Sequence, residues 1–240
     1  MTGASAVRSH PFRSPNSDGA VLRSASDAAF LVGVGIADVT GESAGVGMMG
    51  YAMPHQRTAG IHQRQWARAF TVADPQRPNE PVVFVVADLG MIFQAVHQEV
   101  LRRLHARFGD RYTESNTVLT ATHTHSGPGG FSHHTLYNIT TAGFRPHTFE
   151  AIVSGIVTAI ERADADLAPG SIRWNTGELH GASVNRALLA FERNPIRDRQ
   201  EFPAAIDPQM SVLRFERSGR PVGVLSWFAT HGTSMTNTNT

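Results

Sequence analysis

The apolar residues of this chain repeat with the period of β-strands in several separate segments. Residues 81–87 form an apolar, β-branched run typical of a buried central strand, and residues 65–72 alternate apolar with polar positions. Residues 210–215 and 221–228 flank a Ser-Gly pair, which indicates a hairpin. The complete set of expected strands is 30–36, 65–72, 81–87, 116–122, 171–176, 210–215 and 221–228.

Two other segments have the period of an amphipathic helix. Apolar side chains recur every three or four positions in residues 90–107 and again in residues 149–160. Gly109 is suited to end the first helix, and Pro169-Gly170 is expected to stop the second. Because strands and helices alternate along the chain, the pattern predicts an α/β fold with a layered, mixed β-sheet flanked by helices.

Composition narrows the classes of function. The formal net charge of +1 gives no electrostatic argument for a nucleic-acid partner, and no apolar run approaches the roughly 18 residues of a transmembrane segment. The chain has no cysteine, so a transition-metal site must use histidine with carboxylate, tyrosine or water oxygen. Residues 1–28 are polar and lack the apolar stretch of a secretory signal, which predicts a disordered leader or a non-native start site. The compartment stays undetermined.

A histidine motif follows directly on one predicted strand. The sequence Thr-His-Thr-His-Ser-Gly-Pro-Gly-Gly places His123 and His125 where the strand gives way to a glycine-rich loop. Positions two apart in extended backbone project to the same side, so the pair can present two imidazoles to one cavity, and neutral imidazole is a good zinc donor. Two surface histidines on a turn are the alternative. A phosphate-binding loop at 126–130 is a further reading, which no phosphate-loop or dinucleotide glycine pattern supports.

A second strand ends with the same chemistry. Residues 222–230 form an apolar run that leads into His231-Gly-Thr-Ser-Met. A single histidine after a strand commonly has a structural role. Two such strand ends can nevertheless meet at one edge of a sheet, where α/β proteins place their ligands. The repetition therefore predicts a metal site shared by His123 and His231.

Three other polar residues lie near these motifs. His133 and His134 are candidate ligands, but adjacent residues rarely face the same way, so loop polarity or substrate contact is the preferred reading. Asp88 follows the 81–87 strand and is either close to the metal or, by preference, solvated or N-capping the next helix.

Seven stretches of the chain resemble the neutral ceramidase family, and they occur in the family's order. They include the Thr-His-Thr-His motif and the His-Gly-Thr-Ser-Met motif. Together they span nearly all of the chain after residue 30. The stretches are 33–41, 60–64, 121–130, 136–138, 143–144, 182–186 and 229–235.

The resemblance implies a zinc-dependent hydrolase that cleaves the amide of ceramide to sphingosine and a fatty acid. By this likeness His123 and His231 bind the zinc ion, and His125 lies beside it as a proton-transfer or substrate-positioning group. Arg186 would be a polar residue near the substrate head, acting either on the oxyanion or on the sphingoid hydroxyls. The implied partner is a ceramide-like lipid, with peripheral contact to a membrane surface.

The family pattern also extends beyond this chain. It includes a glutamate and a tyrosine as further zinc ligands, a catalytic serine and a C-terminal immunoglobulin-like domain, which residues 1–240 do not contain. Residues 29–240 are therefore expected to be the N-terminal part of an incomplete catalytic domain, inactive by itself. The alternative is a truncated, non-catalytic domain that binds a metal or a lipid.

Overall fold

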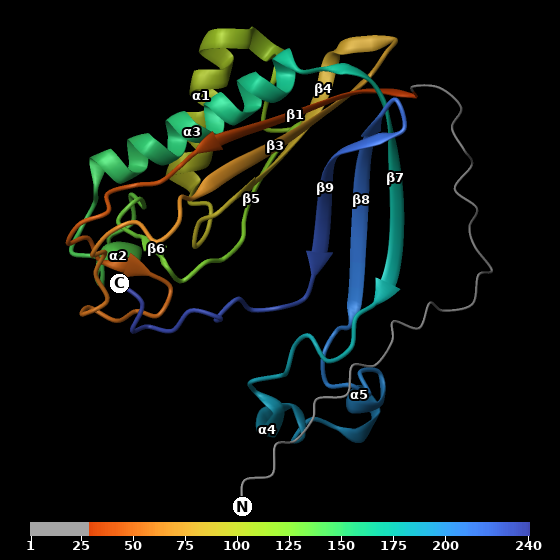
Figure 1. Ribbon diagram of the computed structural model, residues 1–240. Coiled ribbons are helices and arrows are strands. Elements are labelled where there is room, and N and C mark those ends of the chain that lie inside the picture. The colour runs from red at the N-terminus through yellow and green to blue at the C-terminus, as the bar shows by residue number, and fades with distance from the viewer. Residues whose placement is uncertain (1–28) are drawn as a thin grey trace, which may run out of the picture.

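A seven-stranded mixed sheet forms the framework of the protein, whose computed structural model describes residues 29–240 (Figure 1). The strand order is β5-β4-β3-β1-β7-β8-β9, and every neighbouring pair is antiparallel except the parallel pair β4 and β5. The leader expected for residues 1–28 lies outside the described residues. The strands are β1 (Phe30–Asp38), β3 (Trp66–Asp74), β4 (Arg77–Ala87), β5 (Thr117–Ala121), β7 (Ala168–Glu178), β8 (Gln209–Arg217) and β9 (Arg220–Phe228).

Two long helices cover one face of this sheet (Figure 1). They are α1 (Gln94–Phe108) and α3 (Pro146–Ala165), and their apolar faces meet β1, β3 and β4 in the larger of two buried clusters. None of the helices within residues 29–240 is both long and apolar enough to span a bilayer. The short elements are β2 (Met48–Met49), which pairs with β6 (Gly127–Pro128), a 3-10 turn at Gly109–Arg111, α2 (Thr135–Asn138), α4 (Leu188–Phe191) and α5 (Ile196–Gln200).

The opposite face of the sheet is covered by the sheet itself. Phe70 of β3 stacks on Phe215 of β8 at 5.0 Å, and Phe84 of β4 meets Trp227 of β9 edge-on at 5.6 Å between ring centroids. These strand pairs are not neighbours in the sheet, so the sheet must curl until β8 and β9 lie over β3 and β4. The curl matters for the site, because it turns the end of β9 back toward the ends of β4 and β5.

The expected strands and the two long helices are all present, and the predicted fold class is confirmed. One boundary was wrong, because Pro169-Gly170 does not stop the second helix. That helix ends at Ala165, where Asp166 accepts a hydrogen bond from the amide of Val34 and pairs with Arg217, and both Pro169 and Gly170 belong to β7. The chain turns at Asp166 because tertiary partners on β1 and β8 hold its carboxylate there.

Glycines in β1 allow α3 to lie unusually close to the sheet. A Cβ atom on Gly35 would lie 2.1 Å from the carbonyl oxygen of Ala159 and 2.6 Å from the amide nitrogen of Ala163. Both of these are backbone atoms, so a side chain at position 35 can be accommodated only if the helix moves away. The Gly-Val-Gly sequence of β1 thus sets the distance between the two layers.

We predict that Gly35→Ala destabilises the fold by roughly 3 kcal/mol, the upper range for an overpacked core, because α3 must shift away from β1. Urea unfolding followed by circular dichroism would measure this change. The matched control is Gly177→Ala in β7, where an added Cβ meets no atom within 4 Å. We expect that control to be neutral or to stabilise by up to about 1 kcal/mol, and equal losses in the two variants would contradict the explanation.

Candidate metal centre

The curl of the sheet brings the carboxyl ends of β4, β5 and β9 toward one another. Because β4 and β5 are parallel and in register from Val83↔Thr117 to Ala87↔Ala121, their carboxyl ends finish side by side. The chain after β5 carries His123 and His125. The chain after β9 carries His231 and runs back beneath β5 toward the same edge (Figure 1).

The structure brings the three histidines into direct contact. The Nε2 atoms of His123 and His231 are 3.1 Å apart, and those of His125 and His123 are 3.3 Å apart. Each residue offers a ring nitrogen within 4.8 Å of the other two. His123 and His231 are 108 positions apart in the chain, so only the fold can explain their approach.

These distances can be compared with the requirements of a metal ion. Four tetrahedral ligands about 2.05 Å from a zinc ion lie about 3.3 Å from one another. The two shorter nitrogen–nitrogen distances, 3.1 and 3.3 Å, match that spacing. A metal held by histidine nitrogens therefore fits the residues present, and the geometry by itself favours no particular transition metal.

His123 is held in a conformation that the rest of the site must support. Its φ is +58°, in the left-handed region that non-glycine residues rarely adopt. Its Nδ1 lies 2.6 Å from the carbonyl oxygen of Gly90, just beyond the end of β4. A carbonyl oxygen can only accept, so Nδ1 carries the proton and donates it. The Nε2 atom is consequently the unprotonated nitrogen, and its lone pair points at His231 and His125.

His125 is the buried member of the group. Gly50 lies directly against its ring, because a Cβ at that position would be 2.4 Å from ring atom Cγ and 2.6 Å from Cδ2, and Tyr51 packs edge-on at 4.6 Å. Burial, followed by the charges of His123, His231 and Arg186, lowers the pKa of His125 below 6.5. The shift favours the neutral imidazole, which is the form that can accept a proton.

Arg186 lies in the loop between β7 and α4 and is exposed to solvent. Its positive charge lowers the pKa of His125. The pKa of His231 is lowered first by loss of hydration and then by the charge of Arg186. The structure thus brings the fourth residue singled out from the sequence within electrostatic range of the histidines. Its assigned role near a substrate stays a prediction.

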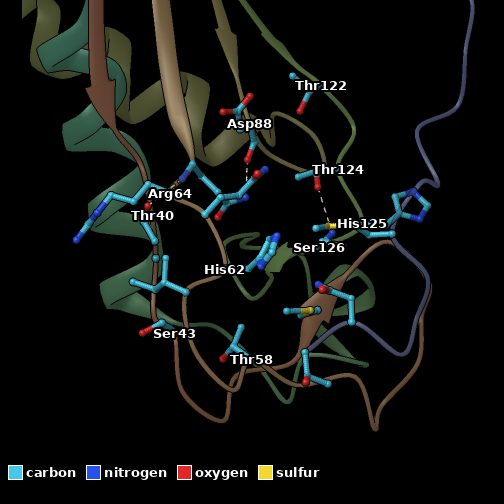
Figure 2. A pocket seen from close by; sticks show the side chains of 18 of the residues that line it. Thr40, Ser43, Thr58, His62, Arg64, Asp88, Thr122, Thr124, His125 and Ser126 are labelled. Atoms are coloured by element: carbon cyan, nitrogen blue, oxygen red, sulfur yellow. Dashed lines mark hydrogen bonds between the residues drawn. The ribbon is translucent and has the colours of Figure 1, made fainter.

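A cavity of about 450 Å³ opens beside His123 and His125. Figure 2 shows Thr40 and Arg64 on one side of it, Thr124 and His125 on the other, and His62 between them. The volume is in the usual range for small-molecule sites. His62 belongs to the stretch 60–64 that resembles the family, but the sequence assigned it no role, because it has no partner at an interpretable spacing.

Asp88 has a structural role that differs from the preferred expectation. The residue that precedes α1 is Phe93, so Asp88 does not cap that helix. Its carboxylate instead accepts hydrogen bonds from the amide of Trp66 and from the guanidinium of Arg68, and the residue lines the cavity. Asp88 therefore ties the ends of β3 and β4 together under the site.

Two other expectations concern the loop after His125. His133 stacks on Phe149 and contacts Phe144, away from the three histidines, and His134 immediately precedes α2. Within 126–130, residues 127 and 128 form β6, and the amide of Gly129 donates to the carbonyl of Gly47. The glycines of this loop serve close packing and strand pairing, which gives the phosphate-binding reading no support.

The arrangement predicts how the titration of His125 responds to Arg186. In the metal-free protein its pKa should lie below 6.5, and Arg186→Ala should raise it, because a repelling positive charge is removed. The pKa should remain lower than that of an ordinary histidine, since burial is the largest cause of the shift. NMR titration of the imidazole protons in the presence of a chelator would measure this, with Arg193→Ala as the control. An unchanged midpoint in Arg186→Ala would place that arginine outside the site.

Comparison with known proteins identifies the family. The model of the neutral/alkaline non-lysosomal ceramidase N-terminal region matches residues 30–240. The neutral ceramidase of Mycobacterium tuberculosis is 53% identical over 209 residues, which are 87% of this chain and 33% of that protein. That of Pseudomonas aeruginosa is 53% identical over 216 residues, which are 90% of this chain and 32% of that protein.

Solved structures agree with the sequence comparison. The crystal structure of neutral ceramidase from Pseudomonas aeruginosa superposes with a TM-score of 0.85 at 54% identity, covering 89% of this chain and 34% of that chain. The chain thus spans about a third of the length of the curated relatives it matches. Over residues 30–240, it belongs to the neutral/alkaline non-lysosomal ceramidase family.

Proposed function

We propose that this chain supplies the N-terminal, zinc-binding part of an active site that hydrolyses the amide of ceramide to sphingosine and a fatty acid. The observation that carries the proposal is the meeting of three imidazole nitrogens within 4.8 Å beside a 450 Å³ cavity. Family membership supports the reaction, since the relatives are named as neutral ceramidases. Peripheral contact with a membrane surface follows from the lipid nature of the substrate.

His123 and His231 are the proposed zinc ligands. Cysteine is absent, so histidine supplies the nitrogen donors, and the 3.1 Å spacing of the two Nε2 atoms suits one shared ion. When bound, zinc supplies Lewis-acid chemistry at an amide carbonyl. The hydrogen bond from Nδ1 of His123 to the Gly90 carbonyl fixes the tautomer that such binding requires.

His125 is the proposed proton carrier. Its lowered pKa favours the neutral ring, which could accept a proton from an attacking water molecule and return it to the departing amine. Amide cleavage needs that second transfer because an amine leaves poorly as an anion. Arg186 would stabilise the oxyanion or hold the sphingoid hydroxyls, and both roles are consistent with its exposed position at the site.

Zinc binding by the chain tests the ligand assignment. We expect His123→Ala and His231→Ala each to weaken zinc affinity by at least about tenfold, since even the loss of an outer-shell partner commonly has that effect. Competition with a chromogenic chelator would measure the affinities. His105→Ala on α1, whose ring faces Asp110, is the control and should bind normally. Full affinity in either ligand variant would refute the assignment.

A chimera tests the reaction itself. Residues 30–240 would replace the matching third of the Pseudomonas aeruginosa enzyme, and the product should hydrolyse a fluorescent ceramide. His125→Ala in this chimera should reduce kcat by about 10² or more while zinc is retained, because a proton carrier is lost. The chain by itself serves as the comparison and should give no turnover. A folded, zinc-loaded chimera without activity would favour a non-catalytic metal- or lipid-binding domain.

A further inference from the structure

The segment between β2 and residue 56 contacts both of the chain segments that carry the clustered histidines. We propose that Tyr51 and Gln56 are positioning residues, which hold the His231 segment against the His125 loop so that the histidine nitrogens stay at metal-binding distance. This inference rests on the proposed metal site. It assigns a function to two residues that no sequence motif marks.

Tyr51 contacts both segments with a single side chain. Its ring packs edge-on against His125, with 4.6 Å between centroids, and its hydroxyl donates a hydrogen bond to the carbonyl oxygen of Met235 at 2.5 Å. A displacement of the His231 segment would therefore move Tyr51 and, through it, the ring of His125.

Gln56 makes a second connection from a fully enclosed position. Its side chain is 1% exposed, and Nε2 donates to the carbonyl oxygens of His125 at 3.2 Å and Asn239 at 3.3 Å. The backbone of Gln56 is itself fixed, because its carbonyl accepts from the amide of Met48 at 2.9 Å. Met48 lies in β2, which pairs with the loop that carries His125.

The segment that carries His231 has few other attachments. Among residues 29–240, the hydrogen bonds joining 231–240 to the chain before β9 come from three side chains: Tyr51, Gln56 and His123. The third of these is the contact between two proposed ligands. Apart from that contact, Tyr51 and Gln56 supply the hydrogen bonds that join residues 231–240 to the chain before β9 in the described part of the protein.

The environment of Gln56 indicates that the residue holds the histidine segments in place more than it stabilises the fold. Its Oε1 atom is buried and, in the described part of the chain, has no hydrogen-bond partner. An acceptor left in that state opposes folding, and an apolar side chain of the same length would remove that cost. Such a side chain would lose the two bonds that join the histidine segments.

Zinc affinity and metal-free stability, measured on the same variants of the chain, test the inference. Tyr51→Phe keeps the ring and removes the hydroxyl, and Gln56→Met keeps the length and removes the donor. We expect each to weaken zinc binding by about three- to tenfold, the effect of one net hydrogen bond. The thermal midpoint of the chelated protein should be unchanged in Tyr51→Phe, because Met235 is only partly buried and water can satisfy its carbonyl. It should fall slightly in Gln56→Met, which leaves the buried carbonyl of His125 without that donor. Tyr137→Phe, at an exposed tyrosine that packs on Phe93, is the matched control.

Each other outcome identifies what is wrong. Normal zinc affinity in both variants would overturn the positioning role and leave the proposed metal site intact. Weakened affinity together with an equally lowered metal-free midpoint would show a general structural role, which also overturns the inference. No zinc binding by the unaltered chain would overturn the metal site and the positioning role together.

Discussion

The approach of His123 to His231 is the contact on which the arrangement of the site depends. The hydrogen bond to Gly90 places the unprotonated Nε2 of His123 toward the ring of His231, and 3.1 Å separates the two nitrogens. Two lone pairs cannot face one another at that distance without a proton or a cation between them. The contact is thus a histidine–histidine hydrogen bond in the absence of a metal, and an ion bound by both residues, as proposed, would replace that proton.

The architecture of the sheet makes this contact attainable. His123 follows β5 at one edge of the strand order, and His231 follows β9 at the other edge. In a flat sheet these edges would be far apart. Two aromatic contacts, Phe70 with Phe215 and Phe84 with Trp227, close the curl that returns β9 toward β4 and β5. The smaller buried cluster, formed by Val32, Phe70, Phe215 and Leu225, therefore positions the site as well as stabilising the fold.

Much of this arrangement could be predicted from local patterns. The β-branched runs fix the strands, and the rule that ligands gather at carboxyl ends of strands leads to His123 and His231. The helix boundary at Pro169-Gly170 was wrong, because distant partners of Asp166 decide where α3 ends. The role of Asp88 was missed for the same reason, since its partners are on β3.

Residues that position the site are harder to find in a sequence than residues that form it. Tyr51 and Gln56 lie in an irregular loop, and their partners are mostly backbone carbonyls, which any residue type provides. A carbonyl acceptor leaves no trace in the residue identities, so periodicity and spacing carry no signal for such contacts. Imidazoles at strand ends, in contrast, are visible because their side chains carry the chemistry.

Several features that oppose folding are concentrated at this edge of the sheet. His123 has a left-handed backbone, and Nδ1 of His125 and Oε1 of Gln56 are buried without partners in the described residues. A left-handed non-glycine residue alone costs on the order of 1–3 kcal/mol. Such unfavourable features persist where the packing of the surrounding structure outweighs their cost. Here the two packed faces of the sheet provide that stabilisation. A cation that binds only the folded arrangement would offset part of that cost. The strain is therefore the consequence of holding three imidazoles together in one preformed arrangement.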